Sequence, residues 1–403
     1  MKHAHEIDLS GARLELGTAA GKLAGAGWGL GVAGILATAG LAFTGAGPTR
    51  ALEAWLVNWT YFLSLTLGAL FFVLLQHVTK AGWSVVVRRI AEGFAANFLL
   101  LAVLAVPILF GMEQLFEWAR PEVVAHDHLL QSKAAYLNRT FFLIRMAGYF
   151  LIWIVLSQWL FSTSVKQDRT GDPELTTRMM KVSCPSMYLF AITLTFAAFD
   201  LLMSLEPRWF STIFGVYFFS GSVLGFLALL PMVSLLTQRS GKLGGIISTE
   251  HYHDMGKLMF AFIVFWAYIA FSQYMLIWYA NIPEETVWFL TRITGGWRGF
   301  SWFILLGHFL FPFLALISRI PKRRPGTLIL GSIWLLGVHW ADLYWLAMPH
   351  TSPDVVPFHV LDLTAFLGVG GCWIGAFAVR MRGKSLIPSR DPRLGESLAF
   401  ENY

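Results

Sequence analysis

Two apolar segments of this chain each end on an aspartate, and these carboxylates are the first candidates for chemistry. Asp200 and Asp342 are each followed by leucine, and each lies seven residues before a proline, Pro207 and Pro349. A carboxylate within hydrocarbon is costly, by about 2.5 kcal/mol or more at a helix centre. Two such acids at matching positions predict a duplicated helical bundle with a polar interior, and ion handling is the chemistry to expect there.

Further polar side chains fall within or at the edge of apolar segments. Histidine titrates near neutral pH and a buried carboxylate can hold a proton, so a ladder of such groups across a membrane is what a proton path needs. From the cytoplasmic face we expect an entrance at Glu250, His253 and Asp254, a relay through Gln273, Tyr274, His308 and His339, and an exit at Asp342 gated by Arg298, with Asp200 and Arg145 as the counterpart in the other bundle.

Two other interpretations of these residues stay open. In the first, Arg145 pairs with Asp200, Arg298 pairs with Asp342, and the ion pairs lock each bundle while the histidines bond backbone carbonyls. In the second, His308 and His339 ligate a haem. Redox haem proteins of this type usually carry bis-histidine pairs at fixed helix spacings, and here only one pair can form. We therefore expect no haem in this chain.

The two cysteines offer no redox or metal chemistry. Cys184 and Cys372 are far apart in the sequence and belong to no CxxC or zinc-type spacing. An iron–sulfur cluster takes about four ligands. We expect two packing thiols, no metal site, no catalytic residue and no cofactor held by this chain.

The elements that position these groups are membrane-spanning helices. Of 403 residues, 56% are hydrophobic and 13% are charged, and the mean hydropathy is +0.60; soluble domains carry roughly 25% charged residues. This composition predicts an all-α integral membrane protein and gives no indication of a nucleic-acid partner. A spanning helix needs about 20 mostly apolar residues, and ten segments qualify: 23–44, 55–78, 94–112, 140–163, 184–205, 211–236, 257–280, 299–319, 327–347 and 358–380.

Lysine and arginine set the orientation of these spans. Of the 30 basic residues, 22 fall on the side of the termini, seven on the opposite side and one, Arg145, within a span. The bias predicts that both termini face the cytoplasm. The two larger loops on the other side, 113–139 and 281–298, are rich in Trp, Glu and His and are expected to be ordered docking surfaces.

The repeated aspartate motif divides the chain into parallel halves. We expect a cytoplasmic segment at 1–22, a membrane domain at 23–380 and a cytoplasmic tail at 381–403. Within the membrane domain, helices 2–5 form one four-helix bundle (about 55–205), helices 6–9 form the second (about 211–347), and helices 1 and 10 flank them. The first span repeats glycine at four-residue spacing, at Gly21, Gly25 and Gly29 and again at Gly27 and Gly31, which predicts a closely packed edge helix.

Three motifs carry a resemblance to a known family. They are Met-Ser-Leu-Glu-Pro-Arg-Trp-Phe-Ser-Thr at 203–212, Glu-His-Tyr-His-Asp-Met-Gly-Lys at 250–257 and Trp-Tyr-Ala-Asn-Ile-Pro-Glu-Glu-Thr at 278–286. With the ten-span outline over residues 20–380, they resemble the NrfD-like integral membrane proteins, the group that includes the membrane anchor of polysulfide reductase. Within that group the chain is most similar to the F-type membrane component of bacterial alternative complex III, a quinol:electron-acceptor oxidoreductase.

The resemblance implies a non-catalytic subunit of a respiratory or photosynthetic electron-transport complex. Its expected partners are a quinol-binding NrfD-like sister subunit, an iron–sulfur subunit, multihaem cytochrome c subunits, small membrane subunits and lipids. Haem c, iron–sulfur clusters and quinol would then reside in the partners, and this chain would support the sister subunit and move protons. Three rivals remain: a quinone-binding anchor of a molybdopterin-type oxidoreductase, a stand-alone secondary transporter, and a purely structural subunit.

Overall fold

The computed structural model of the protein describes residues 13–402, so the first part of the expected 1–22 segment, residues 1–12, lies outside the described chain. Within that range the fold is all-helical, and ten helices are long and apolar enough to span a membrane, which confirms a multi-pass membrane protein. The spans are α1 with its π-helical extension (Thr18–Ala46), α2 (Pro48–Val78), α3 to α5 (Val85–Phe110), α9 (Arg139–Thr170), α10 with a 3-10 turn (Glu174–Leu205), α11 (Phe214–Arg239), α12 (Thr249–Ala280), α14 to α15 (Trp297–Leu316), α17 (Pro325–Ala347) and α18 (Val360–Arg380).

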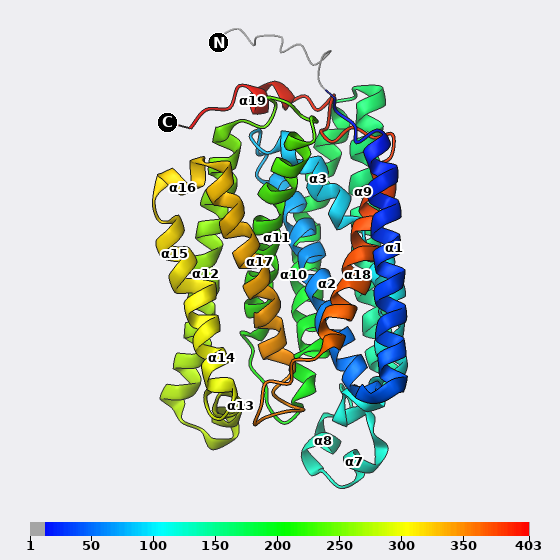
Figure 1. The fold of residues 1–403 in the computed structure, drawn as a ribbon, viewed down its shortest axis with the longest axis vertical. Helices are drawn as coiled ribbons and strands as arrows, with labels where there is room; N and C mark the ends of the chain where they lie inside the picture. The colour runs from blue at the N-terminus through cyan, green and yellow to red at the C-terminus, as the bar shows by residue number, and fades with distance from the viewer. Residues whose placement is uncertain (1–12, 403) are drawn as a thin grey trace.

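Eight of these spans form the two expected four-helix bundles. In the first, α2 packs on α3 and α10, and α9 closes the ring by contacting both α3 and α10. In the second, α11 packs on α12 and α17, and the span from α14 to α15 closes the ring between them. The bundles meet where α2 packs along α11, the two most buried spans. The start of α1 and the short C-terminal helix α19 (Leu394–Leu398) lie at one end of the molecule, called here the α19 end, and α13 (Pro283–Ile293) marks the opposite α13 end (Figure 1).

The two flanking helices lie together on one side of the bundles. α1 packs along α18, and α18 in turn packs on α2 (Figure 1). The contact is close because glycine faces glycine: a Cβ at Gly31 would lie 2.6 Å from the Cys372 amide nitrogen, and one at Gly371 would lie 2.4 Å from the Gly31 amide nitrogen. The expected small-residue contact is therefore real for Gly27 and Gly31, whereas Gly21, Gly25 and Gly29 face open space.

This geometry predicts opposite outcomes for two neighbouring substitutions. Gly31→Leu is expected to force α1 away from α18, at a cost of about 1–3 kcal/mol for overpacking, and to expose the buried Cys372 thiol to a membrane-permeant maleimide. Gly29→Leu, the matched control, projects into open space and is expected to leave labelling unchanged. Labelling in a Cys184→Ser background isolates Cys372, and equal labelling of both leucine variants would contradict the helix contact.

Two features of the α13 end are ordered by specific contacts. In the 113–139 loop, Asp127 accepts the amide hydrogens of Leu129 and Leu130 and caps α8 (His128–Lys133). The Leu130 amide, and after it the Leu129 amide and the Arg208 guanidinium, lower the pKa of the Asp127 carboxyl. The 281–298 loop forms helix α13. Both loops are thus ordered, as expected.

The eighth span is irregular at its centre. It consists of α14 (Trp297–Ile304), a π-helical turn (Leu305–Leu310) and α15 (Phe311–Leu316). Pro312 has no backbone N–H and clashes with the preceding turn of a regular α-helix, which accounts for the widened geometry just before it. His308 lies in this π turn, and such turns recur at functional sites.

Candidate functional site

Asp342, in the second bundle, is buried and accepts hydrogen bonds from neutral donors. Its Oδ1 accepts the Tyr217 hydroxyl at 2.5 Å, and its Oδ2 accepts the Trp266 indole N–H at 3.3 Å. The Nδ1 atom of His308 lies 3.8 Å from Oδ2. Among residues 13–402, no lysine or arginine pairs with Asp342. Two hydrogen bonds therefore stabilise this carboxylate, and its charge has no fixed counterion.

Two buried histidines extend the site from α14–α15 and α17. The Nε2 of His339 lies 2.8 Å from the Ser64 hydroxyl of α2, and the rings of His339 and His308 are 6.1 Å apart at their centroids. The His308 ring packs on Trp266 with centroids 4.0 Å apart. Neither ring nitrogen of His308, nor Nδ1 of His339, has a hydrogen-bond partner within the described residues. These nitrogens remain available to a proton or to water.

A notch in α11 makes room for the His339 ring. A Cβ added at Gly225 would lie 2.8 Å from the imidazole, and one at Gly221 would lie 3.1 Å from it. The two glycines are four residues apart, so they share one face of the helix. The sequence interpretation missed this notch together with Tyr217, Trp266 and Ser64; the glycine spacing within an apolar helix was the one signal that could have pointed to it.

The corresponding acid of the first bundle is neutralised. Asp200 accepts two hydrogen bonds from Arg145, each 2.8 Å long, and one of 2.9 Å from the Tyr149 hydroxyl. The Arg145 guanidinium also lies over the Tyr136 and Phe141 rings, at 3.8 and 4.4 Å from their centroids. The interpretation in which an ion pair locks this bundle is therefore correct for Arg145 and Asp200.

The second expected ion pair is wrong. Arg298 contacts neither Asp342 nor any other carboxylate in the part of the chain that the structure describes, and its side chain lies at the edge of a cavity. The buried arginine nearby is Arg292 of α13, which donates to Glu206 at 2.7 Å and to the backbone carbonyl of Leu346 at 3.0 Å. Burial lowers the pKa of the Arg292 guanidinium, and Glu206 opposes that shift. Arg292 of α13 is therefore buried, whereas Arg298 of α14 is exposed.

The three residues expected at the cytoplasmic entrance lie at the α19 end. Glu250 forms a two-pronged ion pair with Arg323, and Asp254 forms one of 2.5 Å with Lys257. The Nδ1 of His253 is buried and has no partner among the described residues. His253 and Trp266 are 13 residues apart on α12, about 20 Å along the axis. The entrance residues are thus separated from the Asp342 cluster.

One further buried hydroxyl lies between these levels. Ser332 precedes His339 by seven residues on α17, about 10 Å nearer the α19 end and on the same helix face. Its Oγ is buried and has no hydrogen-bond partner within residues 13–402. Ser332 was not among the expected site residues, because a single serine in an apolar span is common.

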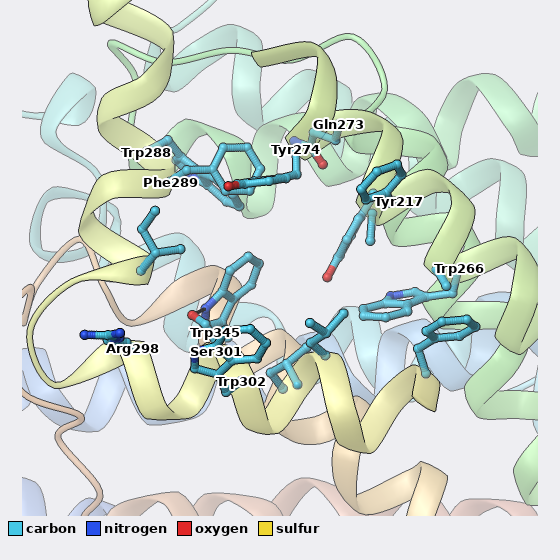
Figure 2. A pocket seen from close by; sticks show the side chains of 17 residues that line it. Tyr217, Trp266, Gln273, Tyr274, Trp288, Phe289, Arg298, Ser301, Trp302 and Trp345 are labelled. Carbon is cyan, nitrogen blue, oxygen red and sulfur yellow. Dashed lines mark hydrogen bonds between the residues drawn. The ribbon is translucent and has the colours of Figure 1, made fainter. Parts of the chain in front are cut away.

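Gln273 and Tyr274 line a cavity beside the Asp342 cluster. The cavity measures about 630 Å³ and lies among α11, α12, α13, α14 and α17. Tyr217 and Trp266, the two donors to Asp342, form part of its wall, and Arg298 lies at its far edge (Figure 2). The structure therefore divides the expected residues into an α19-end group, a central cluster, this cavity, and the separate pair of the first bundle.

The described residues contain no cluster of three or more histidine, cysteine, aspartate or glutamate side chains arranged to hold a metal ion. No protein-family model matches the chain, and no curated protein matches it.

Proposed function

We propose that this chain is an integral membrane subunit of a quinol-oxidising electron-transfer complex of the alternative complex III type. It supports the quinol-binding sister subunit, and its second bundle conducts protons. Its termini face the cytoplasm of a bacterial inner membrane. The sequence motifs support the assignment to that kind of complex, and the environment of Asp342 supports the proton role.

The contrast between the two bundles carries the proton proposal. An acid that serves only to hold helices together is best neutralised by a buried cation, as Asp200 is by Arg145. Asp342 occupies the matching position with neutral donors and an imidazole at 3.8 Å. A carboxylate in that setting can take up and release a proton without breaking an ion pair.

The proposed path runs along α12 and α17. Protons enter near Glu250, His253 and Asp254 at the α19 end and reach Ser332 and His339 through water. His308 then exchanges a proton with Asp342, because its Nδ1 lies 3.8 Å from that carboxylate and has no hydrogen-bond partner within residues 13–402. Gln273 and Tyr274 line the cavity between the cluster and the α13 end. Arg298 is part of that cavity wall rather than a gate on Asp342.

Exposed aromatic side chains at the α13 end support the proposal that this chain holds partner subunits. Tyr279 is 85% exposed and Trp278 is 64% exposed at the end of α12. Large aromatic side chains at a membrane interface have an apolar body and a polar edge, and they are common in protein contacts. These residues are where we expect the iron–sulfur or cytochrome partners to dock.

Asp342→Asn is the decisive test, because asparagine keeps the shape and an acceptor oxygen but cannot exchange a proton. In the intact complex reconstituted into vesicles, we expect assembly and quinol binding to persist while proton translocation per electron falls by about tenfold or more. Proton movement is measured with an entrapped pH-sensitive dye, against electron transfer measured on the same vesicles.

Asp354→Asn is the matched control. It removes an exposed carboxylate at the α13 end and is expected to leave the ratio of protons to electrons unchanged. Tyr217→Phe removes the shorter hydrogen bond to Asp342 and is expected to give an intermediate loss. An unchanged ratio of protons to electrons in Asp342→Asn would eliminate the proton role. Purification of the chain without haem or iron–sulfur partners would instead eliminate the assignment to the complex and favour the transporter.

A further inference from the structure

We propose that the 630 Å³ cavity between α12, α13 and α14 binds one anionic diacyl phospholipid from the leaflet at the α13 end. The phosphate lies at Arg298, an ester carbonyl accepts a hydrogen bond from Gln273, and an acyl chain fills the deeper part. The cavity borders the Asp342 cluster of the proposed proton path, but the lipid proposal rests on Arg298, Gln273 and the apolar wall, whereas the proton proposal rests on Asp342 and its hydrogen bonds.

The cavity opens toward the lipid. Phe271 of α12 and Trp302 and Leu305 from the eighth span line it, and they are 62%, 56% and 47% exposed. Side chains that line a cavity and are also exposed mark its opening, and these three lie on membrane-spanning helices. Figure 2 shows Trp302 and Tyr217 on opposite sides of the space. A ligand of this cavity therefore enters from the bilayer.

The outer edge of the cavity attracts an anion. Arg298 is exposed and forms no ion pair within residues 13–402. At the same end, Arg139, Arg208 and Arg292 each pair with a carboxylate, and Arg120 donates to the backbone carbonyls of Glu113 and Gln114. Arg298 is also the second residue of α14, and Gly296, the N-cap residue of that helix, offers no side-chain cap. Free amides and the helix dipole favour negative charge at such a position.

A side chain that carries a buried donor without a partner lines the same cavity at a deeper level. Gln273 is 3% exposed, lines the cavity, and its Nε2 has no hydrogen-bond partner in the described chain. An unpaired amide in hydrocarbon is costly. Gln273 lies seven residues before the end of α12, which is about 10 Å along the helix axis. An oxygen of the ligand that accepts its hydrogen bond must therefore lie deeper in the membrane than the phosphate.

The inner wall is mostly apolar, because the polar groups of Tyr217 and Trp266 are hydrogen-bonded to Asp342. Ala267 and Ala270 of α12 leave space that Leu305 and Phe309 border from the opposite span. The order from the interface inward is thus cation, amide donor, hydrocarbon. A phospholipid has the complementary order of phosphate, ester carbonyl and acyl chain, and this match identifies the ligand class.

The test uses the purified protein in nanodiscs of phosphatidylcholine supplemented with phosphatidylglycerol, followed by native mass spectrometry of the lipids that stay bound. We expect one retained phosphatidylglycerol, with the ester form preferred over the ether form. Arg298→Gln is expected to weaken retention about fivefold, the effect of one interfacial charge. Gln273→Leu is expected to abolish the preference for the ester, and Ala270→Phe is expected to fill the cavity and remove the lipid.

Arg139→Gln is the matched control, because Arg139 is exposed at the same end but lies outside the cavity. Thermal unfolding of each variant separates lipid loss from misfolding, and Arg298→Gln changes only an exposed side chain. Equal retention in Ala270→Phe and the unchanged protein would show bulk surface lipid only and overturn the proposal. Retention of a prenylated ring compound in place of the phospholipid would overturn it as well.

Discussion

Arg145→Met is expected to lower the free energy of unfolding by about 3–5 kcal/mol, because it leaves the Asp200 carboxylate buried without a cation. Asp200 is fully buried and accepts two hydrogen bonds from Arg145, so the Tyr149 hydroxyl would be its remaining donor. The measurement is thermal or denaturant unfolding in detergent. The double variant Arg145→Met/Asp200→Leu replaces both charges by apolar groups and is expected to recover most of the loss.

The control for this pair is an exposed ion pair of the same protein. Arg139 and Glu113 are 54% and 61% exposed at their side chains, and Arg139→Met is expected to cost less than about 1 kcal/mol. If Arg145→Met proved as mild as Arg139→Met, or if the double variant were no more stable than the single one, Asp200 would not depend on Arg145. The two bundles would then lose the contrast on which the proton proposal rests.

Arg89→Met is expected to have a comparable effect at the α19 end, again about 3–5 kcal/mol. Arg89 is fully buried and donates to Glu92 at 2.9 Å, to Asp168 at 2.7 Å and to the Ser164 carbonyl at 3.0 Å. It thereby joins the third span to α9, and its contact with the Ser385 carbonyl at 3.4 Å reaches the C-terminal tail. Its loss leaves Asp168 without a cation.

Limited proteolysis distinguishes this role from a general loss of stability. We expect Arg89→Met to release the tail after Arg380, so that cleavage there precedes unfolding of the membrane domain. Arg393→Met breaks an ion pair with Glu396 that lies near the surface and is the matched control. If the tail of Arg89→Met stayed protected from the protease, other contacts, such as the ion pair of Arg88 with Asp391, would be sufficient to hold the tail in place.

The sequence predicted the spans well, because crossing a bilayer requires a length of apolar chain that can be counted. It placed some helix starts too late. The third span begins at Val85 rather than at 94, because Arg88, Arg89 and Glu92 interrupt the apolar pattern. Inside the fold the two arginines pair with Glu92, Asp391 and Asp168. The seventh span likewise begins at Thr249 and not at 257.

The candidate site was predicted in part. The buried acids and histidines were identified because ionisable groups in apolar helices are rare, and the pairing of Arg145 with Asp200 was one of the two interpretations left open. The environment of Asp342 could not be derived. Tyr217, Trp266 and Ser64 come from three other helices, and nothing in their local sequence distinguishes them from other hydroxyl and aromatic residues of apolar spans.

Composition, the lengths of the apolar segments and the repeated Asp-Leu motif thus predict a ten-span protein with two matching halves and an aspartate in each. The packing of the helices decided which aspartate acquired a counterion. Arg145 and Asp200 meet because α9 and α10 are adjacent in the first ring. In the second bundle, α13 turns Arg292 toward Glu206, and Arg298 of α14 lies at the cavity edge. The physical reason is that an ion pair depends on the distance between two side chains, and that distance is set by the rotation and crossing of helices that contact each other only after folding.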